Sequence, residues 1–327
     1  MSGTKKHHVV AVDGWINPPP LNFEYDFTKY PTVGQDLLLE HVKDATIVIT
    51  SGRPMNRAVI EAAPVLELIS VSGTGTDHID LEAARERNVA VCRVPAQNTE
   101  TVGEHAFALY FALKRRILPL HNLAADGKTW AQSPPATAKA FGKPPRVNSE
   151  ETLVVVGYGA IGRHVETMGR ALGMNVLIAE RKSSSEIREG RISFDEAVEK
   201  GTVFFIVAPG NDSTRAMFST PEFETMDSSA LIINCGRGGV VSEKEVATAL
   251  REGTIGGYAT DVFEREPATS ENCPLLDPSV PNLIHTPHLA WFSAKAIRGT
   301  IETVKANIEG FVAGKPQNLV VSRKSGP

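Results

Sequence analysis

The chain has 327 residues, 42% of them hydrophobic, and its net charge is -4. A chain of this length usually divides into two domains, and its composition supports folded cores. The small net charge argues against a nucleic-acid partner, and the sequence offers no run of about eighteen apolar residues that would predict a membrane span. Three scattered cysteines show no metal-ligand spacing and are typical of a reducing compartment, so the expected location is the cytosol.

Apolar runs alternate with helix-like segments from end to end, an order that predicts parallel α/β sheets. The first third is expected to hold strands at 8–12, 45–50, 67–71 and 89–92 and helices at 55–63 and 81–87. A longer helix at 101–118 and a loop-rich, proline-containing stretch at 124–149 should follow. The second series of strands is expected at 153–156, 176–179, 203–207, 231–234, 257–261 and 283–285, before a last helix at 293–312. Within this series, Ser242 and Glu245 form a capping-box pattern that predicts a helix start.

The most informative motif joins strand 153–156 to the helical segment after it. Gly157, Gly159 and Gly162 form the pattern G-x-G-x-x-G, and Glu180 closes the next strand. In this context the first glycine permits a tight turn, the second lets the backbone approach a pyrophosphate, and the third lets the helix pack closely. The helix N-terminus adds free N–H groups for the phosphates. The motif therefore predicts a dinucleotide site in which Glu180 accepts hydrogen bonds from ribose hydroxyls.

The residues after Glu180 leave the choice of cofactor open. An acid at the ribose repels a 2′-phosphate and selects NAD, whereas an arginine beside it can bind that phosphate. Arg181 and Lys182 follow the acid directly. We expect NAD, with NADP as the alternative.

Three further polar groups follow strands of the same predicted sheet. Arg237 stands among glycines after strand 231–234, Glu266 follows strand 257–261, and His288 follows strand 283–285. Ligands bind at the carboxyl ends of such strands, so these side chains should converge. An ordinary surface ion pair is the alternative for Arg237, and a lone histidine is more often structural than catalytic. His285 is the competitor of His288, and we expect it to be packed because it lies inside the strand.

The motifs together resemble those of the NAD-dependent D-isomer-specific 2-hydroxyacid dehydrogenases. The resemblance extends over segments 72–80 and 102–105, the glycine pattern, and the segments around Arg237, Glu266 and 286–288. It implies two Rossmann-like domains, with a doubly wound nucleotide-binding domain, 99–290, inserted in a flavodoxin-like substrate domain formed by 1–98 and 291–327. It also implies a homodimer formed through the nucleotide-binding domain.

The resemblance assigns roles to the three strand-end residues. Arg237 would bind the substrate carboxylate and carbonyl, His288 would act as acid or base, and Glu266 would support His288. These roles suit the chemistry, because reduction of a 2-oxo acid needs a hydride and a proton, and histidine titrates near neutral pH. A neighbouring carboxylate should raise the pKa of His288.

Other positions carry weaker assignments from the same resemblance. Further substrate contacts would come from Thr74, Gly75, Thr76 and Trp291. The residues expected at the cofactor, besides the three glycines and Glu180, are Val102, Ala160, Ile161, Arg181, Pro209, Thr214, Cys235 and Asp261, the last at the nicotinamide carboxamide. Cys235 is expected to be a small buried residue without a redox role, because it has no paired histidine or second cysteine.

Substrate identity rests on finer likenesses. Segment 176–182 and the residues from His288 to Trp291 are most similar to glycerate dehydrogenases and hydroxypyruvate or glyoxylate reductases. A tryptophan after the histidine, here Trp291, is also a point of similarity to the C-terminal binding proteins, which are corepressors of this fold. An NAD(H)-sensing binding module is therefore the alternative function. Glu266 argues against formate and Thr74 against phosphite as substrate. Loops near Trp15 and Arg53 should complete the pocket for the substrate side chain.

Overall fold

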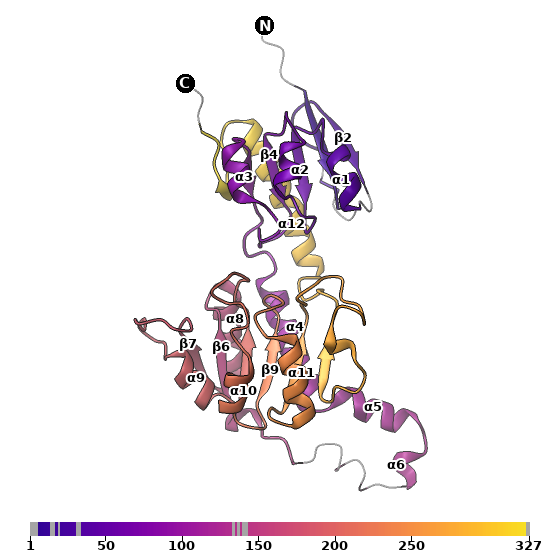
Figure 1. The fold of residues 1–327 in the computed structure, drawn as a ribbon, viewed down its shortest axis with the longest axis vertical. Coiled ribbons are helices and arrows are strands. Elements are labelled where there is room, and N and C mark those ends of the chain that lie inside the picture. Colours follow the sequence, from indigo (N-terminus) through magenta and orange to yellow (C-terminus); the bar gives the residue numbers. More distant parts are fainter. Residues whose placement is uncertain are drawn as a thin grey trace. The chain divides into compact units, whose positions relative to one another are not determined.

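The computed structural model describes residues 6–13, 17–18, 20–30, 34–132, 135, 138 and 143–324. The chain forms two compact units (Figure 1). Unit 1 combines Met1–Gln97 with Ser293–Pro327, and unit 2 is the continuous segment Asn98–Phe292. Each unit is built on a six-stranded sheet with helices on both faces. The predicted α/β fold, with one doubly wound unit inserted in another, is confirmed.

Unit 1 has the strand order β12-β5-β4-β3-β1-β2. All its strand pairs are parallel except β12 with β5. Without β12 the order is that of a flavodoxin-like sheet. Its strands are β1 (His7–Ala11), β2 (Tyr25–Lys29), β3 (Ile47–Thr50), β4 (Leu68–Val71), β5 (Ala90–Cys92) and β12 (Leu319–Val321), and its helices are α1 (Gln35–His41), α2 (Arg57–Glu61), α3 (Leu81–Glu86) and α12 (Ala294–Val312).

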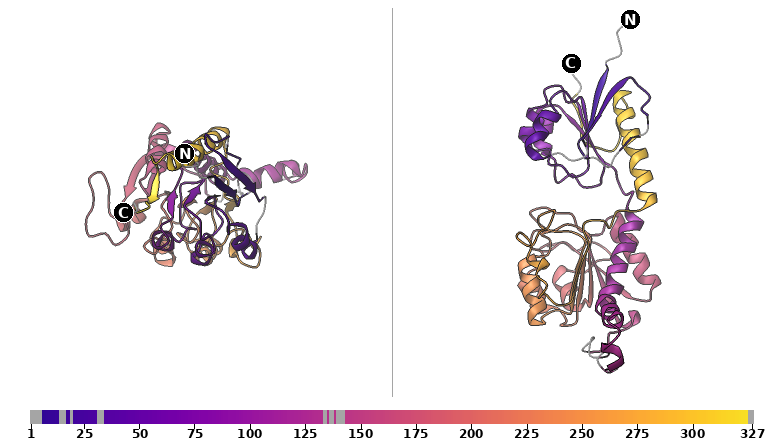
Figure 2. Two further views of the ribbon diagram at one scale, coloured as in Figure 1. Left: turned by 90° about the horizontal axis from the view of Figure 1, so that it is seen from above. Right: turned by 90° about the vertical axis from the view of Figure 1, so that its right-hand side faces the viewer.

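The two faces of the unit 1 sheet are covered by different helices (Figure 2). Val10 and Val48 pack with buried residues of α1, α2 and α3. Val9 and Ile47, their neighbours along the same strands, pack on the other side with Val304 of α12. Successive side chains of a strand point to opposite faces, so each strand contributes side chains to two hydrophobic cores.

Unit 2 has the strand order β11-β10-β9-β8-β6-β7, and all its strand pairs are parallel. The strands are β6 (Thr152–Val156), β7 (Asn175–Ala179), β8 (Val203–Ile206), β9 (Leu231–Asn234), β10 (Gly257–Thr260) and β11 (Leu283–His285). The chain order reverses at β6, which lies between β7 and β8. Open α/β sheets bind ligands at the carboxyl ends of the strands at such a switch point.

Helices cover both faces of this sheet as well. One face packs against α4 (Thr99–Lys114) and α8 (Ala160–Ala171). The other packs against α9 (Phe194–Lys200), α10 (Thr220–Thr225) and α11 (Glu243–Glu252). Two more helices, α5 (Ile117–Ala125) and α6 (Thr129–Gln132), lead away from the sheet (Figure 1). Among the described residues, no helix has both the length and the apolar character needed to cross a membrane.

Several predicted elements differ from the observed ones. The helix expected at 101–118 is broken, because Arg116 has a φ of 51° and separates α4 from α5. Three observed elements, β2, α1 and β12, carried no prediction: β2 and α1 mix polar and apolar residues over a short span, and β12 has only three residues. Ser242 does precede α11, but its side chain makes no cap hydrogen bond, and Glu245 instead accepts the N–H of Thr220 at 2.8 Å. The stretch 124–149, expected to be loop-rich, contains α6, and part of it lies outside the described residues.

Candidate active site

The glycine turn between β6 and α8 has the shape that a dinucleotide needs. Gly157 has a φ of +96°, and a Cβ there would lie 2.6 Å from the backbone N of Ala208. A Cβ on Gly162 would lie 2.2 Å from the carbonyl O of Gly157, so α8 packs tightly on the turn. A Cβ on Gly159 would meet nothing within 4 Å. Open space therefore faces the N-terminus of α8, where free N–H groups favour phosphate.

Glu180 closes β7 and is 3% exposed. Its carboxylate accepts the Nε–H of Arg188 at 2.7 Å and the backbone N–H of Arg181 at 2.8 Å. Arg191 lies 3.7 Å away. The hydrogen bonds from Arg188 are the main reason that the pKa of Glu180 falls to about 2. The acid lies at the strand end as predicted, whereas Arg188 and Arg191 lie farther along the chain and carried no prediction.

Arg237, Glu266 and His288 follow three strands that are adjacent in the sheet, β9, β10 and β11. Because the strands are parallel, their carboxyl ends lie along one edge. The Arg237 guanidinium donates to the carbonyl O of Gly236 at 2.9 Å. Its charge lowers the pKa values of both Glu266 and His288, although other groups contribute more. The structure thus brings the three predicted catalytic side chains together.

His288 and Glu266 form a directly bonded pair. The distance from Nδ1 of His288 to Oε2 of Glu266 is 2.6 Å, and the side chains are 41% and 35% exposed. The hydrogen bond to Glu266 raises the pKa of His288 and outweighs the opposing effect of burial. Burial disfavours ionisation of Glu266, but the bond to His288 and its charge outweigh this, so the pKa of Glu266 lies below its usual value. The pair therefore favours the protonated form of an imidazole that solvent can reach.

Asp261 organises the loop that carries His288. His288 has a φ of 54°, an uncommon conformation for a residue other than glycine. The buried Asp261 carboxylate accepts the hydroxyl of Thr286 at 2.6 Å, the N–H of Leu289 at 2.9 Å and the N–H of Ala290 at 2.7 Å. The donors lie on both sides of His288 in the sequence, so one carboxylate fixes the turn. Contact with a nicotinamide carboxamide remains a prediction.

Two further histidines lie near this loop. Nε2 of His105, on α4, lies 2.9 Å from the Thr286 hydroxyl and 3.6 Å from Asp261. The sequence predicts no role for His105 in this network. His285 is exposed and lies beside the ring of Phe263, with 6.2 Å between centroids, so its expected packed position is wrong.

The residues with weaker cofactor assignments lie in unit 2. Val102 and Cys235 are buried, and burial raises the pKa of the Cys235 thiol well above its usual value. The hydroxyl of Thr214 donates to the carbonyl O of Pro209 at 2.8 Å, which closes the loop after β8. Trp291 is partly buried and contacts Phe292 edge to face, with 5.4 Å between ring centroids.

Comparison with known proteins identifies the family. The family model described as D-isomer specific 2-hydroxyacid dehydrogenase, NAD binding domain, matches residues 107–290. The chain belongs to this family. It is 34% identical over 300 residues to the glycerate dehydrogenase of Methylorubrum extorquens, with 91% of this chain and 93% of that protein covered. It is 30% identical over 309 residues to the glyoxylate reductase of Korarchaeum cryptofilum, with 91% and 90% covered.

A solved structure supports the same assignment. The 2-hydroxyacid dehydrogenase from Ketogulonicigenium vulgare Y25 matches with a TM-score of 0.78 and 25% identity, over 97% of this chain and 99% of that one. The protein is therefore an oxidoreductase of the D-2-hydroxyacid dehydrogenase family that uses a nicotinamide cofactor.

The substrate residues predicted in this dehydrogenase are divided between the two units. Thr74, Gly75 and Thr76 are partly buried in the loop after β4 of unit 1, and Trp291 lies in unit 2. The Thr74 hydroxyl donates to the carbonyl O of Val94 at 2.9 Å. Trp15 lies outside the described residues.

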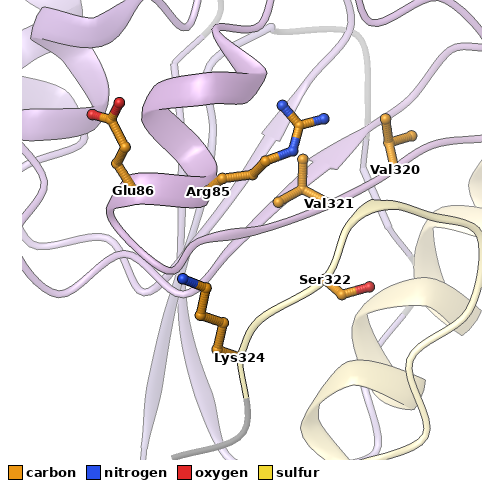
Figure 3. A pocket seen from close by; sticks show the side chains of 6 residues that line it. All are labelled: Arg85, Glu86, Val320, Val321, Ser322 and Lys324. Carbon is orange, nitrogen blue, oxygen red and sulfur yellow. The ribbon is translucent and has the colours of Figure 1, made fainter.

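A surface hollow elsewhere in unit 1 has no link to these predictions. It lies between α3 and the chain around β12, as Figure 3 shows, and it is lined by Arg85, Glu86, Val320, Val321, Ser322 and Lys324. None of the predicted site residues lines it. We therefore place the candidate active site at the strand ends of unit 2.

Proposed function

We propose that this dehydrogenase reduces hydroxypyruvate or glyoxylate, with His288 as proton donor. The bonded pair of His288 and Glu266 next to Arg237 carries the proposal, because it combines a protonated imidazole with a cation for the substrate carboxylate. Relatives named glycerate dehydrogenase and glyoxylate reductase support this class of substrate.

Each side chain has a defined task in the reaction. When bound, the reduced nicotinamide supplies the hydride for the carbonyl carbon of the substrate. The guanidinium of Arg237 can hold a carboxylate with two parallel hydrogen bonds and stabilise negative charge on the carbonyl oxygen. Nδ1 of His288 faces Glu266, so Nε2 is the atom that gives its proton to that oxygen. Glu266 keeps the ring oriented and charged.

The reaction can be tested with purified protein by following NADH absorbance. Hydroxypyruvate, glyoxylate, pyruvate and a branched 2-oxo acid should be compared, and one of the first two should be reduced fastest. His288→Ala should lower turnover by about two to four orders of magnitude while NADH binding persists. His285→Ala is the matched control and should remain active. If the wild-type protein bound NADH but reduced none of these acids, a cofactor-sensing module would replace this proposal.

We infer that NAD is preferred over NADP. Glu180 stays ionised because its pKa is about 2, and its charge would repel a 2′-phosphate. Arg188 is held by Glu180 and is not free to bind that phosphate. Glu180→Ala should therefore shift the ratio of kcat/KM values toward NADPH, and adding Arg188→Ala should remove the gain. Equal losses with both cofactors would contradict a role of Glu180 at the ribose.

We also propose a homodimer formed through the projecting α5 and α6 helices. No residue of α5 is buried, and Ile117, Leu118 and Trp130 are 51%, 50% and 59% exposed. Several large exposed apolar side chains on one projecting segment favour an interaction site, and a second copy would cover them. Light scattering after gel filtration should show a dimer, and Leu118→Glu together with Trp130→Glu should produce monomers. A wild-type monomer would refute the interface.

The cytosol is the proposed location of the protein. Cys92, Cys235 and Cys273 are all free and buried, a state that fits a reducing compartment. Cell fractionation with an antibody against the chain would test this, and recovery from an oxidising compartment would contradict it.

A further inference from the structure

Glu243 is a buried carboxyl group without a part in the roles described so far. It begins α11 and is 4% exposed. A buried carboxyl group is unfavourable unless it is hydrogen-bonded. Oε1 of Glu243 accepts the backbone N–H of Glu264 at 2.7 Å, and Oε1 of Glu264 accepts the N–H of Glu243 at 3.3 Å. The two bonds join the N-terminus of α11 to the loop after β10.

This loop also carries Glu266. One carboxylate oxygen of Glu266 accepts the N–H of Phe263 at 3.0 Å, and the other bonds to His288 at 2.6 Å. The peptide N–H held by Glu243 lies between Phe263 and Glu266 in the sequence. A shift of the Glu264 backbone would therefore move the side chain that orients His288.

The same peptide is packed from a second side. A Cβ on Gly238 would lie 1.9 Å from the carbonyl carbon and oxygen of Phe263, so the backbone after Arg237 rests directly on the Phe263 carbonyl. Contact at this distance tolerates no side chain. The loop is thus held between Gly238 and Glu243. Gly238 directly follows Arg237, which we propose to bind the substrate carboxylate.

We propose that Glu243 is a positioning residue, which holds the loop at Glu264 so that Glu266 keeps its hydrogen bond to His288. The inference rests on the proposed role of His288 as proton donor. Burial raises the pKa of Glu243, the bonds from Glu264 and the Cys273 thiol oppose this, and the charges of Glu264 and Glu266 add to it. A carboxyl or amide oxygen can accept the Glu264 N–H, so the function depends on the acceptor and not on charge.

Three variants separate this role from general stabilisation. Glu243→Met removes the acceptor of the Glu264 N–H and keeps the side chain at nearly the same length. Glu243→Gln keeps an oxygen that can accept this N–H. Glu245→Gln is the matched control, because Glu245 lies on the same helix but bonds to Thr220. The pKa of His288 is measured by NMR titration of its ring protons in the full chain with NAD bound, with His288→Ala to assign the signals.

Glu243→Met should lower the pKa of His288 and reduce kcat/KM by about tenfold, equivalent to about 1.4 kcal/mol in the barrier. Glu243→Gln and Glu245→Gln should keep both values, with kcat/KM within about twofold of wild type. An unchanged pKa of His288 in Glu243→Met would overturn the proposal, as would an equal loss in Glu243→Gln. If Glu243→Met did not fold, Glu243→Ala would be used under the same criteria. If the wild-type chain reduced no 2-oxo acid, the proposed function would fail, and the titration would still decide the role of Glu243.

Discussion

Replacement of Asp261 by alanine should strongly destabilise the loop that presents His288. The Asp261 carboxylate is 1% exposed and accepts the Thr286 hydroxyl and the N–H groups of Leu289 and Ala290 at 2.6 to 2.9 Å. A buried donor left without a partner costs about 1–3 kcal/mol. Ala290 is buried, whereas Leu289 is 44% exposed, so water can accept a hydrogen bond from its N–H. Counting Ala290 in mid-range and the other two donors at the low end gives about 4 kcal/mol.

The expected loss can be measured by urea denaturation followed by tryptophan fluorescence, since Trp130 and Trp291 both lie in unit 2. Thr286→Val is the matched control. It removes the hydroxyl and its contacts with Asp261 and His105, leaves the two N–H bonds in place, and should cost only about 1 kcal/mol. If Asp261→Ala lost less than about 1 kcal/mol, the three donors would have found other acceptors, and the carboxylate would not hold the turn at His288.

Two further variants test the proton donor and the cofactor turn. Glu266→Gln should lower the pKa of His288; since reduction needs imidazolium, which is lost as pH rises through this pKa, the alkaline limb of the kcat/KM profile should move to lower pH. A limb that stayed in place would exclude Glu266 as the cause of the raised pKa. Gly157→Ala should weaken NAD binding by at least about tenfold in calorimetry, because its Cβ would lie 2.6 Å from the N of Ala208. Gly190→Ala is the control, with a φ of +75° and nothing within 4 Å of its Cβ, and equal binding by both variants would contradict the close-approach argument.

The convergence of Arg237, Glu266 and His288 could be predicted because each follows an apolar run in a chain of alternating strands and helices. In a parallel sheet, the ends of such runs meet at one edge whatever the details of packing. The same reasoning located Glu180 at the end of β7. It depends only on chain order and hydrophobic patterning, which the sequence shows directly.

Contacts made by side chains from distant loops could not be predicted in this way. Arg188 reaches Glu180 from a loop that has no periodic pattern, and Glu243 reads as an ordinary acid in a first helical turn. The break at Arg116 was missed because apolar residues continue on both sides of it, and the left-handed backbone there leaves no mark in the hydrophobic pattern. These features depend on tertiary packing, which overrides local propensity.

The discontinuity of unit 1 has a consequence for synthesis on the ribosome. Unit 2 is continuous in sequence and can fold as soon as Phe292 has left the ribosome, because domains generally fold as units. The residues of Met1–Gln97 are made first, yet one face of their sheet waits for Val304 and Ile308 of α12, and the edge of β5 waits for β12. The part of the nascent chain that is made first is thus the last to be completed. Throughout translation it exposes an apolar face and an unpaired strand edge, to which chaperones can bind.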